Sequence, residues 1–161
     1  MERIKLITII LLLISSSLKG QDHSSVQIFE GRGIHNNAQL ILDLSYQNLK
    51  SVPIQANNPQ IEILILDNNN IEELPIWISN LKNLKLLSVR NNNLTRISSF
   101  LSSCENLEQL YLSGNKNLSD LPNMANCKKL KLVDVVDTQI NEIPISIRMM
   151  DNLFYFKYIE K

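Results

Sequence analysis

The chain repeats itself every 23 residues, and this period constrains its fold more than any other feature. Complete copies start at positions 61, 84, 107 and 130, an earlier copy carries Leu42 and Leu44, and a truncated one starts at Leu153. One such unit cannot bury its apolar side chains alone. Stacked units can, so the period predicts a repeat architecture with one continuous core.

Each copy follows the pattern L-x-x-L-x-L-x-x-N-x-L-x-x-L-P, and the second copy shows it in Ile61, Leu64, Leu66, Asn69, Ile71, Leu74 and Pro75. The L-x-L part places two apolar side chains on the same face of a short strand. Each Leu buried in this way contributes about 1.5–3 kcal/mol to folding. Proline ends the extended run and begins the next segment.

These residues resemble the leucine-rich-repeat family over about residues 39–159. The resemblance implies an α/β solenoid, a right-handed superhelix with a parallel β-sheet on its concave side and short helical or 3-10 segments on its convex side. We therefore expect residues 39–161 to form one domain of about five repeats and a truncated terminal one. Residues 21–38 would form an N-terminal cap segment.

A polar position recurs where each repeat turns inward, and it is occupied by Gln47, Asn69, Asn92, Asn115 and Thr138. We expect these side chains to bond backbone groups of neighbouring turns that would otherwise stay unpaired. The two end members depart from Asn, as is usual for terminal repeats. Two further columns should point into the core from the convex side: Ile78, Leu101, Met124 and Ile147, and Leu81, Cys104, Cys127 and Met150.

Side chains between the core positions of each strand should face outward on the concave side. The candidate partner-binding residues are therefore Tyr46, Ile63, Ile65, Asp67, Leu86, Ser88, Arg90, Gln109, Tyr111, Leu132 and Asp134. The row that contains Ile63, Leu86 and Leu132 is apolar, and exposed apolar rows usually mark interaction surfaces. Alternatively, flanking loops cover this row, or it only supports strand formation. Trp77 is expected to cover the convex core.

Cys104 and Cys127 occupy equivalent positions in adjacent repeats. We expect both to be buried free thiols, because Leu81 and Met150 fill the same column and cysteine behaves as a small apolar residue in a core. The alternative is a disulfide, which requires Cα atoms about 4.4–6.8 Å apart.

Charge and motifs argue against several classes of function. The chain has 16 basic and 16 acidic residues, so it lacks the positive charge on which nucleic-acid binding depends. No histidine lies within the repeats, and no Gly-rich phosphate loop or metal-ligand spacing occurs. We therefore expect no catalytic residues, no metal and no cofactor. Asn93 and Asn117 begin sequons that matter only in a glycosylating organism.

Residues 1–20 are typical of a signal peptide: charged at the start, apolar from Leu6 to Ile14 except for Thr8, and small near Ser15 and Gly20. The apolar run is about half of the ~20 residues that a membrane-spanning helix needs. We expect cleavage near Gln21 and a secreted, extracellular or periplasmic protein without a stable membrane span. Retention as a signal anchor is the alternative.

Together these features predict a secreted or surface module that binds a protein partner, which is the usual role that the family resemblance implies. Two other hypotheses remain: a structural envelope component that self-associates, and a protein that captures carbohydrate or another ligand. The partner's identity and the oligomeric state stay open.

Overall fold

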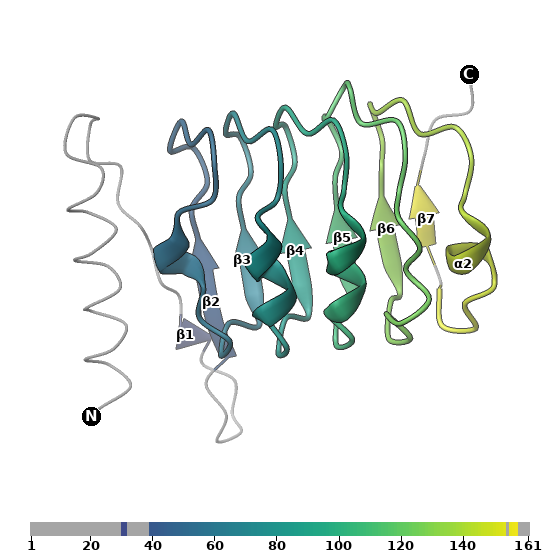
Figure 1. Cartoon of the computed structure of the whole chain (residues 1–161), viewed down its shortest axis with the longest axis horizontal. Helices are drawn as coiled ribbons and strands as arrows, with labels where there is room; N and C mark the ends of the chain where they lie inside the picture. Colours follow the sequence, from purple (N-terminus) through teal and green to yellow (C-terminus); the bar gives the residue numbers. More distant parts are fainter. Residues whose placement is uncertain (1–29, 32–38, 154, 158–161) are drawn as a thin grey trace.

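The structure is a computed structural model that describes residues 30–31, 39–153 and 155–157. A seven-stranded sheet runs in chain order (Figure 1). The short strand β1 (Glu30–Gly31) pairs antiparallel with β2 (Gln39–Asp43). The remaining strands are parallel: β3 (Ile63–Ile65), β4 (Leu86–Ser88), β5 (Gln109–Tyr111), β6 (Leu132–Asp134) and β7 (Tyr155–Lys157).

The register of this sheet follows the sequence period. Leu64 lies opposite Leu87, Leu87 opposite Leu110, and Leu110 opposite Val133. Parallel strands with this constant offset place equivalent residues of successive repeats side by side. The predicted solenoid and its columns are therefore confirmed.

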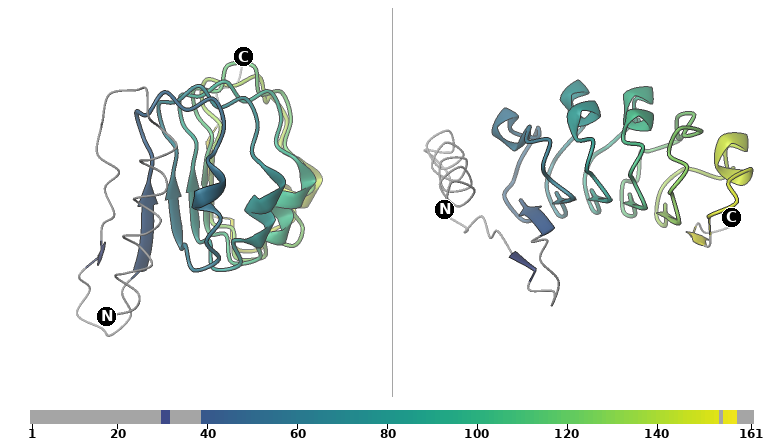
Figure 2. Two further views of the ribbon diagram at one scale, coloured as in Figure 1. Left: turned by 60° about the vertical axis from the view of Figure 1, so that its left-hand side comes forward. Right: turned by 90° about the horizontal axis from the view of Figure 1, so that it is seen from below.

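Short helical segments lie on the opposite side from the sheet, on the outer side of the curved stack (Figure 2). They are the 3-10 helices η1 (Ile54–Ala56), η2 (Ile76–Asn80) and η3 (Ser99–Ser103) and the single α-helical turn α2 (Ile145–Arg148). Pro53, Pro75 and Pro144 precede three of them, with φ near −60°. Proline has this φ in any context and therefore ends the preceding extended run at a fixed angle.

The structure assigns no helical segment to the convex stretch between β5 and β6. The sequence explains this difference. The turn after Asn115 has one residue more than its equivalents, whereas the stretch from Pro122 to Met124 has one residue fewer than that from Pro75 to Ile78. The repeat keeps its length of 23 residues, but the convex stretch is too short for a helical turn.

The core is one continuous layer between the sheet and the convex segments. Leu64, Leu87, Leu110 and Val133 of the strands are fully buried. The two convex columns point inward as predicted, except that Met150, in the last repeat, is only half-buried. Trp77 also packs against this core, as predicted.

The signal peptide predicted for residues 1–20 lies outside the described residues, as does most of the cap segment predicted for 21–38. In the described part of the chain, no helix is both long and apolar enough to cross a membrane.

Candidate interaction surface

The concave face carries the predicted row that contains Ile63, Leu86 and Leu132, and this row is half-buried. Its members in β2–β6 all keep part of their surface exposed: Ile41, Ile63, Leu86, Gln109 and Leu132. Register pairs align them across five adjacent strands. Four of these five residues are apolar, so the exposed sheet carries an apolar row that polar Gln109 interrupts.

Arg90 and Tyr111, two of the predicted partner-binding residues, meet at the centre of this face. The Arg90 guanidinium lies 4.0 Å from the centre of the Tyr111 ring. The Tyr111 hydroxyl donates a hydrogen bond of 2.8 Å to Gln109 Oε1, which fixes the ring over the sheet. Arg90 also forms an ion pair of 3.5 Å with Asp134 two strands away. A cation over an aromatic face is attracted by the ring's negative charge density, so this pair forms a preorganised patch.

Three concave aspartates bond backbone N–H groups just beyond the strands. Asp67 Oδ1 accepts hydrogen bonds from the backbone N–H of Arg90, at 2.8 Å, and from the Ser88 hydroxyl, at 2.6 Å. Asp43 and Asp134 accept from the N–H groups two residues further along, Ser45 and Val136. These carboxylates satisfy donors that the parallel ladder leaves unpaired.

Two residues predicted for the partner-binding face are buried, which corrects that expectation. Ser88 is 4% exposed and Asp134 is 9% exposed. Both lie opposite Tyr111 in the register, one on each side. Ser88 donates its hydroxyl hydrogen to Asp67, and Asp134 pairs with Arg90, so both offer little surface of their own.

A further column, at the rim of the face, has a left-handed backbone that sequence reasoning missed. Tyr46, Asn68, Asn91, Gly114 and Asp137 all have φ between 52° and 79°. Asn, Asp and Gly tolerate this region, whereas a bulky side chain rarely occupies it. In the sequence, the recurrence of Asn, Asn, Gly and Asp at this position of successive repeats indicated the left-handed backbone. Tyr46 is the exception and is 72% exposed.

The predicted asparagine ladder joins consecutive repeats. Asn92 Oδ1 accepts the N–H of Ile71 at 2.9 Å, and its Nδ2 donates to the carbonyl oxygens of Leu66 and Arg90. Asn69 and Asn115 make equivalent bonds to the repeats before them. Each buried amide therefore closes the loop of the preceding repeat.

The ladder stops at Thr138, which corrects its predicted role. The Thr138 hydroxyl donates to the Val135 carbonyl and accepts from the N–H of Ile140, both in its own repeat. The extra residue in the preceding turn explains the difference. It allows Leu118 N–H to bond the Asn115 carbonyl at 3.0 Å, so this donor no longer needs an amide from the next repeat. At the other end, Gln47 takes part through its backbone N–H, which donates to Asn69 Oδ1.

Both cysteines are buried and unpaired, as expected. Cys104 donates its thiol hydrogen to the Ile78 carbonyl at 3.3 Å, and Cys127 lies 3.5 Å from the Cys104 carbonyl. Burial raises the pKa of Cys104 from 9.0 to about 11, although nearby Lys82 opposes the shift. Burial, with Cys104 and Glu105 nearby, raises the pKa of Cys127 to about 12. Neither thiol is suited to nucleophilic chemistry, which requires a thiolate.

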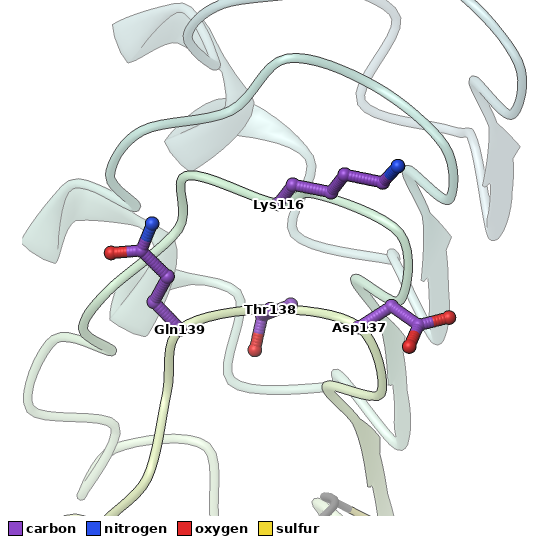
Figure 3. A pocket seen from close by; sticks show the side chains of 4 residues that line it. All are labelled: Lys116, Asp137, Thr138 and Gln139. Carbon is purple, nitrogen blue, oxygen red and sulfur yellow. The ribbon is translucent and has the colours of Figure 1, made fainter.

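An open depression of about 410 Å³ lies beside the longer turn, lined by Lys116, Asp137, Thr138 and Gln139 (Figure 3). The lining side chains extend in different directions along the two neighbouring turns and do not converge on a common point (Figure 3). It therefore lacks the converging polar groups of a small-molecule site.

Isoleucines on the convex side are exposed, which sequence reasoning also missed. Ile54, Ile76 and Ile145 follow the prolines that begin η1, η2 and α2, and they are 59%, 72% and 74% exposed. The signal was present in the recurring Pro-Ile pair. The equivalent positions in the third and fourth repeats are Ser99 and Asn123, so these isoleucines do not form a continuous row.

Comparison with known proteins supports the same class of fold. Residues 59–116 match one sequence model of the leucine-rich-repeat family, and residues 106–127 match another. The chain is a leucine-rich-repeat protein. Domains of this family are generally protein-binding modules and are usually non-catalytic.

Three relatives illustrate how far the similarity extends. A probable serine/threonine-protein kinase of Dictyostelium discoideum is 37% identical over 71 residues, which make up 43% of this chain and 6% of the kinase. A leucine-rich-repeat protein of Leptospira interrogans is 26% identical with a TM-score of 0.62, over 71% of this chain and 36% of that protein. The leucine-rich-repeat ectodomain of a receptor kinase from Arabidopsis thaliana is 21% identical with a TM-score of 0.66, over 96% of this chain and 92% of that ectodomain. The chain thus spans only small parts of the first two.

Proposed function

We propose that the chain is a recognition module that binds a protein partner through the concave face of its sheet. The observation that carries this proposal is the Arg90–Tyr111 pair, stacked at 4.0 Å beside the half-buried apolar row of the sheet. Tyrosine and arginine are the residue types that most often dominate binding energy, above all near the centre of an interface. Leu86 and Leu132 flank the pair and supply apolar surface that a partner can cover.

The pair is also held in place before any partner arrives. Gln109, Asp134 and the Asp67–Ser88 contact fix the side chains or backbone on both strands. Binding then costs little side-chain entropy, which favours affinity. Neither Arg90 nor Tyr111 fills the core, so their function can be tested without unfolding the protein.

The test begins with a pull-down that uses the chain from Gln21 onward as bait, followed by affinity measurements on the recovered partner. Tyr111→Ala and Arg90→Ala should each weaken binding by about 2 kcal/mol or more. Lys82→Ala is the matched control, since Lys82 is exposed on the convex side and contacts the Ser103 carbonyl. Normal binding by both concave variants together with loss in the control would contradict the proposal.

We further propose that the protein is exported, with residues 1–20 removed. The charged start, the short apolar run and the small residues before Gln21 support this. Intact-mass measurement on protein recovered outside the cytoplasm tests the proposal. A mass that still includes residues 1–20 would contradict cleavage.

A further inference from the structure

We propose that the concave face binds a basic segment of its partner, in which Lys or Arg side chains alternate with apolar ones. This inference rests on the proposed function and specifies the partner's chemistry. Along strands β2–β6 and the rim beyond their carboxyl ends, the charged side chains are four carboxylates, Asp43, Asp67, largely buried Asp134 and Asp137, and one guanidinium, Arg90. At the opposite rim, Glu62 pairs with Lys85 and Glu108 with Lys131, so these four charges cancel. The whole chain has equal numbers of acidic and basic residues, so this acid excess is local to the face.

The acid excess is greatest in the N-terminal half of the face. Arg90 lies within ion-pair distance of Asp134, whereas no cation of the described residues does so for Asp43 or Asp67. Both of these carboxylates accept their hydrogen bonds from neutral N–H and hydroxyl groups, through Oδ1. No cation among the described residues therefore compensates these two carboxylates, and a bound partner would have to supply one.

The apolar row passes beside these two carboxylates. Ile41 lies in the same strand as Asp43, and Ile63 lies in the strand that leads to Asp67. Ile65 pairs with Asp43 in the register. A partner that covers the row must also remove water from the carboxylates. Burying a charge without a partner is costly, so an acidic or neutral segment is disfavoured and a basic one is selected.

A basic segment with apolar neighbours satisfies both requirements at once. An extended chain presents alternate side chains on one face at a spacing close to that of the rows on a sheet. Exposed Tyr46 at the rim adds an aromatic face for a further cation. The same charge disfavours nucleic acids and acidic proteins.

The probe is a phage-displayed library of random 12-residue peptides, selected against the chain from Gln21 onward. Sequences enriched by the wild type should be rich in Lys or Arg with intervening apolar residues. Asp43→Asn with Asp67→Asn should weaken the selected peptides about tenfold or more, because each Asn keeps the Oδ1 acceptor and removes only the charge. Glu72→Gln with Glu142→Gln is the matched control, since both glutamates are exposed and lie outside the concave columns.

The outcomes separate this inference from the proposed function. If the selected peptides are acidic or neutral but do not bind Leu86→Glu or Tyr111→Ala, the inference of a basic partner is wrong and the concave site still stands. Basic peptides that bind the doubly neutralised variant as tightly as the wild type would also overturn it. If no selected peptide depends on the concave residues, both proposals fail.

Discussion

At the residue scale, the asparagines of the ladder show how much one side chain can contribute. The Asn92 amide serves three backbone groups in a buried position, as a donor to two carbonyls and an acceptor from one N–H. Water cannot replace these bonds inside the core, so loss of the amide leaves buried polar groups without partners.

Asn92→Ala should therefore lower the free energy of unfolding by about 1–3 kcal/mol. Neighbouring Asn93 is exposed, and its backbone is not left-handed. Asn93→Ala should therefore change the free energy of unfolding by no more than about 0.5 kcal/mol. Urea denaturation of both variants measures the difference. Asn68 is unsuitable as a control, because it is half-buried with φ of 57°. Equal midpoints for Asn92→Ala and Asn93→Ala would contradict the role of the ladder.

Tyr46 shows the opposite case, a side chain whose backbone conformation costs stability. It has φ of 58° and is 72% exposed, so little packing offsets the strain. Tyr46→Asn introduces the residue found at the equivalent positions 68 and 91, and it should raise the free energy of unfolding by about 0.5–1 kcal/mol. Thermal denaturation checks this. A lower melting temperature would mean that the tyrosine ring contributes more to folding than its exposure indicates.

At the element scale, the sequence predicted most of the architecture. The spacing of Leu64, Leu87 and Leu110 fixed the strand register, because only one alignment buries all three. It also placed Arg90 beside Tyr111. The burial of Ser88 and Asp134 could not be predicted, since it depends on how the longer neighbouring side chains lie across the sheet. The absence of a helical segment between β5 and β6 could have been predicted from the shortened stretch that begins at Pro122. That prediction requires the turn after Asn115 and the convex stretch to be aligned separately with their equivalents, because the repeat as a whole keeps its length.

The convex cysteines make the stability of the domain depend on pH. Their ordinary pKa is 9.0, and in the folded protein the values are about 11 for Cys104 and about 12 for Cys127. From pH 9 upward the unfolded chain releases thiol protons that the folded chain retains, so unfolding becomes more favourable as the pH rises. The free energy of unfolding should fall between pH 9 and about 11.

Other groups titrate in the same range, so the comparison needs a variant without thiols. Cys104→Ala with Cys127→Ala should be less stable throughout, because it leaves space in the core. Its decline between pH 9 and 11 should nevertheless be shallower than that of the wild type. Denaturant titrations at several pH values measure both slopes, and parallel slopes would show that the thiols ionise equally in the folded and unfolded chains.

At the scale of the whole molecule, the structure is a linear stack in which each repeat depends on its neighbours. Asn69 and Asn92 both donate to the Leu66 carbonyl, whereas Asn69 and Asn115 share no partner. Side chains that share a partner couple energetically, and side chains that are distant and share none act additively.

A pair of double-mutant cycles tests this nearest-neighbour organisation. Alanine at positions 69 and 92 should show a coupling of about 0.5 kcal/mol or more, and alanine at 69 and 115 should be additive within about 0.5 kcal/mol. Serine can replace alanine if a double variant does not fold. Equal coupling in both cycles would show that the repeats respond as one unit and not as a chain of neighbours.

The ladder also has a direction, and this matters when the protein is made. Each asparagine reaches back to the repeat before it, so a loop stays open until the next repeat has been synthesised. On the ribosome, folding must then lag behind synthesis by about one repeat. The turn after Asn115 is different, because Leu118 bonds within its own repeat and does not wait for its successor. The fourth repeat can therefore pair this donor as soon as it emerges, whereas its strand still waits for the hydrogen bonds to the next repeat.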